Sequence, residues 1–242
     1  MRYIRTMILY YGVTSSRNTG PNRPILSTPI SNHLQLIAAS YGKTMKSAVV
    51  NTISLGDTAQ MQLVVLKEKT PLGCSIHSST FGFSVLCDTS SIQRISFGIP
   101  SPILWWPTGS GPAYLYDDTL VLTDATGEEI QRYPYSFGVR TVKLNQLKDQ
   151  WGTSFEFEIN GKPMFMKGGD MIPPSMFGGH TSKQEWQEWV NLMVNSNFNM
   201  VRIWGGGDYA TEDFLNECDR LGLMVWHDAM FACAMYPGDS LF

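Results

Sequence analysis

The chain has 242 residues, of which 43% are hydrophobic and 16% are charged, so it can bury a sizeable core and is not a disordered chain. A formal net charge of -3 and the absence of a basic stripe argue against a nucleic-acid partner. No apolar run reaches the length of a membrane helix, so no membrane is expected either. Aromatic residues make up 12%, and they either fill the core or offer flat surfaces on which sugar rings stack.

Neither the N-terminus nor the cysteines fix the compartment. The segment MRYIRTMILYYGV lacks the apolar stretch and the small-residue cleavage site of a secretion signal, so we interpret it as a strand. Cys74 and Cys87 either pair across a hairpin or remain buried thiols. The four cysteines form no cluster with histidine at metal spacing, and no metal or cofactor is expected.

Up to about residue 149 the chain consists of short apolar runs separated by Gly, Pro, Ser and Asn, without helical periodicity. Strands are predicted at residues 33–39, 48–53, 61–66, 81–86, 94–99, 115–122 and 137–144. Asp124-Ala-Thr-Gly127 has the composition of a turn. Many short strands without helices are typical of a sandwich, so a β-sandwich domain is predicted over residues 1–149. Residues 1–32 belong to it or are a remnant of a preceding domain.

After residue 150 strands and helices alternate. Asn160-Gly161 between two apolar runs predicts a hairpin, and a Gly- and Pro-rich loop follows at residues 168–179. Ser182 with Glu185 forms a capping-box pattern at the start of one helix. Its apolar face is predicted to contain Trp186, Trp189, Val190, Met193 and Val194.

A second βα unit follows the first. Thr211 is predicted to cap its helix, whose apolar face holds Phe214, Leu215, Cys218 and Leu221, and Gly222 to end it. Strands are predicted at residues 199–204 and 223–226. This alternation indicates a parallel sheet, so residues 150–242 are predicted to form the N-terminal part of an α/β barrel domain.

Five side chains follow or end the predicted parallel strands, where parallel α/β barrels place their sites. They are Asp170, Arg202, Trp204, Tyr209 and Asp228. Arg202 stands inside an otherwise apolar strand, and a charge there needs an acidic partner. We predict that Arg202 orders acidic groups at a sugar-binding site, on which Trp204 stacks. The alternatives are a purely structural ion pair and a core tryptophan.

Two neighbouring features have weaker assignments. Gly205 to Gly207 match no phosphate-binding pattern, and we predict that they keep a loop thin beside a ligand. His227 is adjacent to Asp228, but adjacent strand residues face opposite ways, which argues against a direct role for both.

Several motifs carry a family resemblance. They are Asn199-Met-Val-Arg-Ile-Trp-Gly-Gly-Gly207, Cys218-Asp-Arg-Leu-Gly222, Val225-Trp-His-Asp-Ala-Met-Phe-Ala-Cys-Ala234 with Tyr236-Pro237, Leu104-Trp-Trp-Pro107 and Asn160-Gly-Lys-Pro163. Over residues 100–242 the chain resembles the β-mannosidase branch of glycoside hydrolase family 2. The resemblance implies a multi-domain α and β chain, with an immunoglobulin-like β-sandwich followed by an incomplete (β/α)₈ TIM barrel.

The resemblance also implies a function. Family members of this kind are retaining exo-glycosidases that release terminal β-D-mannose from the non-reducing end, using one glutamate as acid/base and another as nucleophile. Both are expected beyond Phe242, so this chain has no catalytic residue and is expected to be inactive alone. The residues expected to bind the substrate are the same five, Arg202, Trp204, Asp228, Asp170 and Tyr209.

Two departures leave the sugar open. The family usually has Gln at the position of His227, and Asn with an aromatic residue at Asp170 and Met171. The alternatives are therefore an exo-β-glucosaminidase or other family 2 glycosidase, a non-catalytic carbohydrate-binding remnant, and a partner-binding sandwich. Three parallel strands with an open edge are also expected to aggregate.

Overall fold

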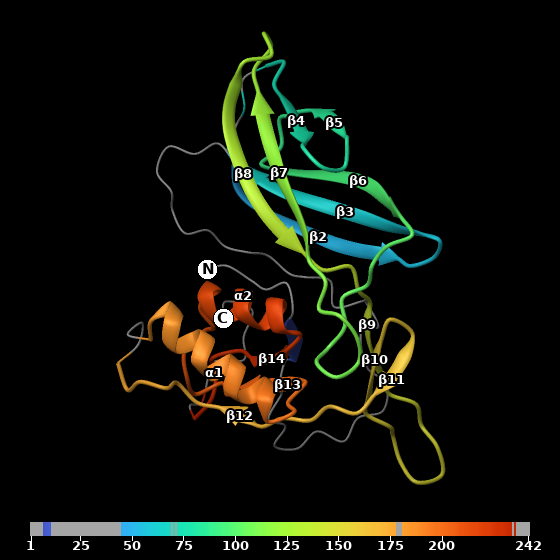
Figure 1. Cartoon of the computed structure of the whole chain (residues 1–242), viewed down its shortest axis with the longest axis vertical. Coiled ribbons are helices and arrows are strands. Elements are labelled where there is room, and N and C mark those ends of the chain that lie inside the picture. The colour runs from blue at the N-terminus through green and yellow to red at the C-terminus, as the bar shows by residue number, and fades with distance from the viewer. Residues whose placement is uncertain are drawn as a thin grey trace. The chain divides into compact units, whose positions relative to one another are not determined.

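The computed structural model describes residues 7–10, 45–68, 70, 72–177, 181–233 and 235. They fall into two compact units (Figure 1). The described residues of the first unit run from 45 to 106 and from 111 to 165, apart from residues 69 and 71. Those of the second are 7–10, 107–110 and the described residues from 166 onward. The strand predicted at 33–39 lies outside the described residues, as does most of the segment 1–32.

The first unit is a sandwich of two antiparallel sheets. One has the order β2-β3-β6 and the other β5-β4-β7-β8, as Figure 1 shows. The strands are β2 (Met45–Ser54), β3 (Thr58–Lys67), β4 (Ser75–Ser78), β5 (Ser84–Leu86), β6 (Ile92–Pro100), β7 (Tyr116–Thr123) and β8 (Glu129–Phe137). Three and four strands in this order match an immunoglobulin-like arrangement, which agrees with the predicted sandwich.

Alternation of side chains builds the core between these sheets. On β3 the residues Ala59, Met61, Leu63 and Val65 are almost fully buried, while the residues between them are more exposed. Side chains in a strand point alternately to opposite faces, so one face of β3 enters the core and the other meets solvent. All described cysteines are free thiols, Cys74 and Cys87 among them.

One carboxylate sits inside this unit as the centre of a polar network. Asp118 on β7 is buried and accepts hydrogen bonds from Ser78 Oγ (2.8 Å), Tyr135 OH (2.7 Å) and the Thr80 amide (2.9 Å). Burial raises the pKa of Asp118, but these hydrogen bonds together lower it by more, so the pKa lies below its ordinary value.

We therefore expect the sandwich to lose stability in acid. A depressed folded-state pKa contributes stability that is present above the ordinary aspartate pKa and is lost as the pH falls through the folded-state pKa. Asp118→Asn should cost about 2 kcal/mol at pH 7 and flatten this acid dependence. Denaturant unfolding between pH 2 and pH 7 measures both. The exposed neighbour Asp117 is the control, because Asp117→Asn should change neither.

The predicted strands differ from the observed ones in the second sheet. The strand predicted at 137–144 is wrong, because Phe137 ends β8 and a separate strand, β9 (Val142–Asn145), begins after a break. Strands β4 and β8 were not predicted. The polar β8 contains Pro134, a residue that is normally excluded from central strands. Its place at the sheet edge explains the exception, because an edge strand tolerates a missing N–H donor.

The predicted Asn-Gly hairpin is confirmed. It joins β10 (Glu156–Ile159) to β11 (Lys162–Met164), and β9 pairs on the other side of β10. Asn160 and Gly161 have φ values of 51° and 76°, as a type I′ turn requires. The Asn160 side chain also accepts from the Thr141 amide and donates to the Trp105 carbonyl, which ties the turn to the rest of the unit.

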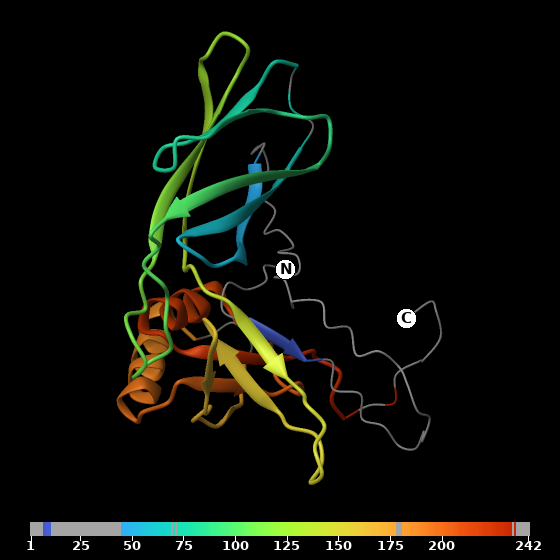
Figure 2. The same ribbon diagram turned by 90° about the vertical axis from the view of Figure 1, so that its right-hand side faces the viewer.

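The second unit contains a parallel sheet of order β1-β14-β13-β12. Its strands are β1 (Met7–Tyr10), β12 (Asp170–Met171), β13 (Met200–Ile203) and β14 (Met224–Asp228). The N-terminal strand prediction is confirmed, and Figure 2 shows β1 beside β14. The expected open edge beyond the third strand is wrong, because the backbone of β1 occupies it in parallel register from Met7 opposite Val225 to Tyr10 opposite Asp228.

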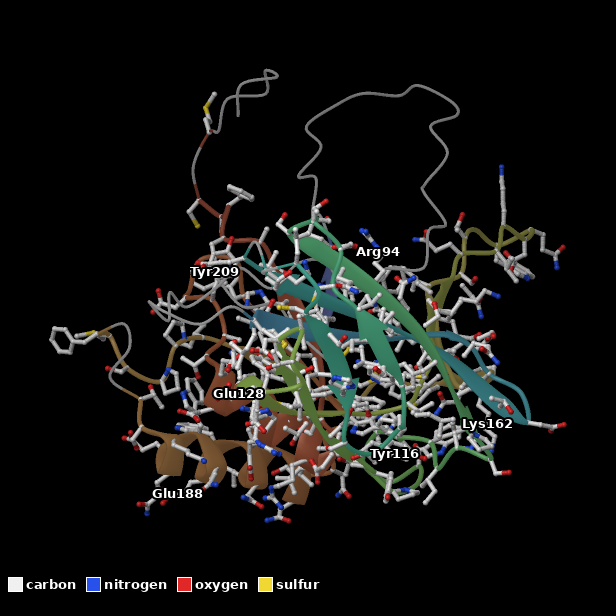
Figure 3. All side chains as sticks on the ribbon, turned by 90° about the horizontal axis from the view of Figure 1, so that it is seen from above. Arg94, Tyr116, Glu128, Lys162, Glu188 and Tyr209 are labelled. Carbon is white, nitrogen blue, oxygen red and sulfur yellow. The ribbon has the colours of Figure 1, made fainter. Side chains whose placement is uncertain are left out.

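Helices α1 (Lys183–Asn195) and α2 (Glu212–Leu221) connect these strands. The capping box of Ser182 with Glu185, the Thr211 cap and the left-handed Gly222 are all confirmed. Trp186 packs on Phe214 with ring centroids 5.0 Å apart, whereas Trp189 is 44% exposed because it lies at the margin of the apolar face. Figure 3 shows Glu188 of α1 pointing away from the helix.

A short segment between β6 and β7 in sequence forms hydrogen bonds to the C-terminal end of α2. Residues Pro107–Ser110 belong to the second unit. Thr108 donates through Oγ1 to the Leu221 and Gly222 carbonyls (2.8 and 3.1 Å) and through its amide to Gly222. Carbonyls at a helix C-terminus lack partners within the helix, so Thr108 satisfies groups that would otherwise stay unpaired. None of the helices in the described part of the chain is long and apolar enough to cross a membrane.

Candidate functional site

Register places three site residues on one face of the parallel sheet. Asp170 is opposite Arg202, and Arg202 is opposite Trp226 on the next strand. Residues opposite one another in neighbouring strands face the same side, and Asp228 is two residues beyond Trp226, so it shares that face. The other face is apolar and closed, since Ile203 and Val225 are at most 3% exposed.

Arg202 forms ion pairs with both acidic residues. Its Nε and Nη2 donate to Asp228 Oδ1 and Oδ2 at 3.2 and 2.6 Å, a bidentate arrangement. Its Nη1 contacts Asp170 Oδ1 and Oδ2 at 3.3 and 3.2 Å. The predicted acidic partners of Arg202 are therefore present, and the fork of the guanidinium matches the Asp228 carboxylate as such pairs usually do.

The electrostatics leave this cluster with one unbalanced negative charge. The hydrogen bond to Asp228 raises the pKa of Arg202, and this outweighs the opposite effect of burial, so the guanidinium stays charged. Two aspartates around one arginine give a formal charge of −1. The Asp170 side chain is 60% exposed and that of Asp228 only 20%, so a ligand reaches Asp170 more readily.

In the loop after β13, Gly205 and Gly206 lie so close to neighbouring atoms that a Cβ would not fit. A Cβ at Gly206 would lie 2.2 Å from Cη2 of Trp204, and one at Gly205 would lie 2.7 Å from the Ala229 carbonyl oxygen. The Gly205 amide also donates to Asp228 Oδ2 at 3.2 Å. The loop is therefore thin, as predicted, and the half-buried Trp204 indole rests against Gly206.

Tyr209 and His227 form a second group beside the cluster. Their rings stack with centroids 5.5 Å apart and 20° between planes, and the Met230 amide donates to Tyr209 OH at 3.5 Å. His227 is fully buried and lies on the face of β14 opposite to Asp228. The structure thus joins Asp170, Arg202 and Asp228 directly, while Tyr209 (labelled in Figure 3) is held through His227.

The role of His227 in this group could not be found from the sequence, which offers only a histidine beside an aspartate in an apolar strand. No glutamate of the chain stands on β12, β13 or β14. Among the side chains that the structure describes, no three His, Cys, Asp or Glu residues gather closely enough to hold a metal ion. The described side chains of the site offer charge, hydrogen bonding and ring stacking.

Parts of this chain are similar to known proteins. A family model described as Glycosyl hydrolases family 2 matches residues 38–140. The β-mannosidase B of Aspergillus terreus is 34% identical over 179 residues, which are 74% of this chain and 21% of that protein. That of Aspergillus niger is 40% identical over 144 residues, which are 60% of this chain and 17% of that protein.

Solved structures agree with these relatives. The β-D-mannosidase of Dictyoglomus thermophilum has a TM-score of 0.72 at 35% identity, covering 80% of this chain and 25% of that one. An exo-chitosanase of Amycolatopsis orientalis shares the fold, with a TM-score of 0.60 at 23% identity over 76% of this chain and 22% of that one. The chain spans about a fifth of the length of the curated relatives that it matches. Over the residues that match, the chain is similar to the glycosyl hydrolases of family 2, and among them to β-mannosidases.

Proposed function

We propose that the chain provides the sugar-binding opening part of a glycoside hydrolase that acts on terminal β-D-mannose. The observation that carries this proposal is Arg202, held by Asp170 and Asp228 at the C-terminal ends of three neighbouring parallel strands. Parallel α/β barrels place substrate sites at that end. The relatives that match this part of the chain are β-mannosidases, which supports mannose as the sugar.

We also infer that the parallel sheet is the beginning of a (β/α)₈ barrel, formed mainly by the described residues from 166 onward, and that the first unit is the sandwich domain. Consecutive parallel strands joined by α1 and α2 support this, because barrels repeat that unit. In such an enzyme the face carrying Arg202 would line the barrel interior. In this chain the Arg202 side chain on that face is 40% exposed.

Each site residue has a role in this proposal. Asp170 and Asp228 accept hydrogen bonds from sugar hydroxyls, and Arg202 fixes the position of both carboxylates. Trp204 offers its indole to the apolar face of the ring, and Tyr209 borders the site from the loop before α2. Retaining glycosidases need two carboxyl groups about 5 to 5.5 Å apart on either side of the bond that breaks. We propose that those glutamates belong to the part of the full-length enzymes that this chain does not span.

Binding of methyl β-D-mannoside to the purified chain tests the proposal. Trp204→Ala should weaken binding at least about tenfold, since ring stacking is worth on the order of 1 kcal/mol or more. Titration calorimetry and saturation-transfer NMR measure the affinity, and an aryl β-mannoside should not be hydrolysed. Trp151 is the matched control, because it is 88% exposed in the first unit and Trp151→Ala should leave binding unchanged. Equal binding by both variants, or turnover, would count against the proposal.

An amino sugar is the second candidate, and the charge of the cluster favours it. A formal charge of −1, with Asp170 exposed, would attract the ammonium group of a β-glucosaminide. If glucosamine is the ligand, Asp170→Asn should weaken its binding and the wild-type affinity should fall with added salt. If mannose is the ligand, its affinity should not change with added salt, because mannose carries no charge.

A further inference from the structure

We propose that His227 is a positioning residue, which in one neutral tautomer locks the loop carrying Tyr209 to the end of β14 beside the sugar site. This inference rests on the proposed function for its link to sugar binding. The lock itself is a property of the folded chain, and it can be measured without any ligand.

The two ring nitrogens of His227 have partners of opposite kind. Nε2 is 3.1 Å from the Ala210 amide nitrogen, which can only donate a hydrogen bond. Nδ1 is 2.6 Å from the Asp228 carbonyl oxygen, which can only accept one. The proton must therefore reside on Nδ1, and Nε2 must be the acceptor. The partners themselves decide the tautomer.

This arrangement connects two loops that border the same site. Ala210 and Tyr209 immediately precede the Thr211 cap of α2, and the Tyr209 ring stacks on the imidazole. On the other side of the ring the hydrogen bond fixes the backbone of Asp228, whose carboxylate reaches Arg202. His227 thus acts on the sugar site through Tyr209 and Asp228, although its own side chain lies on the opposite face.

Protonation would break the lock. A second proton on Nε2 would face the Ala210 N–H, so two donors would oppose each other in a buried place. Burial lowers the pKa of His227, and this outweighs the opposite effect of the Asp228 carbonyl and carboxylate. Asp228 is the charged group that acts on the ring, and Tyr209 is the titratable group stacked on it. In register, β13 places the apolar residue Ile203 opposite His227, and the backbone of β1 lies on the other side of β14.

The sign of the pH effect follows. The neutral ring makes both hydrogen bonds, so the lock is intact above the ordinary histidine pKa of about 6.5. The lock fails as the pH falls through the folded-state pKa, which is lower than this value. Glutamine at this position has one acceptor and one donor and cannot be protonated. His227→Gln should therefore keep the lock without its acid sensitivity, whereas His227→Phe keeps the ring stacking and removes both hydrogen bonds.

Two measurements on the full chain test the proposal. Long-range ¹H–¹⁵N NMR should show the Nδ1–H tautomer for the signal that disappears in His227→Gln. Amide exchange at Ala210 should be slow in the wild type and in His227→Gln, and at least about tenfold faster in His227→Phe. An Nε2–H tautomer, or equal Ala210 protection in all three chains, would overturn the lock even if every chain is folded.

Methyl β-D-mannoside binding then separates the lock from the proposed function. Wild-type affinity should fall as the pH drops through the folded-state pKa of His227, which lies below its ordinary value. The affinity of His227→Gln should not fall, and His227→Phe should bind about tenfold more weakly at pH 7.5. The same acid loss in wild type and His227→Gln would overturn the positioning role. Failure of the wild type to bind any sugar, with the Nδ1–H tautomer and Ala210 protection as expected, would refute the proposed function and support the lock.

Discussion

Replacing Gly168 with alanine is expected to unfold the parallel sheet under conditions where the original chain is folded. A Cβ at this position would lie 1.7 Å from the Met200 carbonyl oxygen and 2.8 Å from its carbonyl carbon. Both contacts are to backbone, which cannot turn away as a side chain can. We expect a loss of about 4 kcal/mol or more, a large part of the stability of an ordinary domain.

The adjacent glycine provides a matched control. A Cβ at Gly169 would meet only the Phe198 ring at 3.7 Å, an ordinary contact distance. Gly169→Ala should therefore change the free energy of unfolding by less than about 1 kcal/mol. Amide exchange in α1 and α2 reports on this unit separately from the sandwich. If the α1 and α2 amides exchange as slowly in Gly168→Ala as in Gly169→Ala, the backbone can move to accept the added Cβ and the prediction is wrong.

Replacing Arg202 with methionine is expected to abolish sugar binding and to destabilise the end of the sheet. The stem of the side chain is preserved, but Asp170 and Asp228 then face each other without a cation. Because Arg202 is 40% exposed, water reduces the loss of stability to about 1 to 2 kcal/mol at pH 7. The effect on sugar affinity should be larger, since both carboxylates lose the position that Arg202 gives them.

Acid should partly restore this variant. Two neighbouring carboxylates without a cation repel each other, and acid relieves this repulsion because it neutralises carboxylates. This is the opposite of the acid loss expected for the Asp118 network. Asp170→Asn is the control, because Asp170 is 60% exposed and its removal should cost less than about 0.5 kcal/mol. A chain with Arg202→Met that binds the sugar normally would exclude the cluster from the site.

Local signals predicted much of this fold because they depend on neighbouring residues only. The Asn160-Gly161 turn requires positive φ at both positions, and few other residue pairs supply it. The caps at Ser182 and Thr211 satisfy amides within three residues. Strand β8 escaped prediction because its edge position, which permits Pro134, is a property of the whole sheet.

The ion pairs of Arg202 were predictable in part. An arginine in an apolar strand requires an acidic partner, and Asp170 and Asp228 on the neighbouring strands fill that role. The contact of Gly168 with Met200 and the hydrogen bonds of His227 depend on how separate segments approach each other. Nothing in the residues themselves distinguishes Gly168 from Gly169. Only their surroundings do.

The pairing of β1 with β14 has a consequence for the order in which the chain folds. Met7 lies opposite Val225, so this ladder joins nearly the two ends of the chain and closes a very long loop. The sandwich strands from β2 to β8 are contiguous and pair mostly with near neighbours in sequence. During synthesis the sandwich can therefore form early, whereas the N-terminal strand must wait until β14 has left the ribosome. Until then β1 is an unpaired apolar strand that a chaperone would be expected to bind.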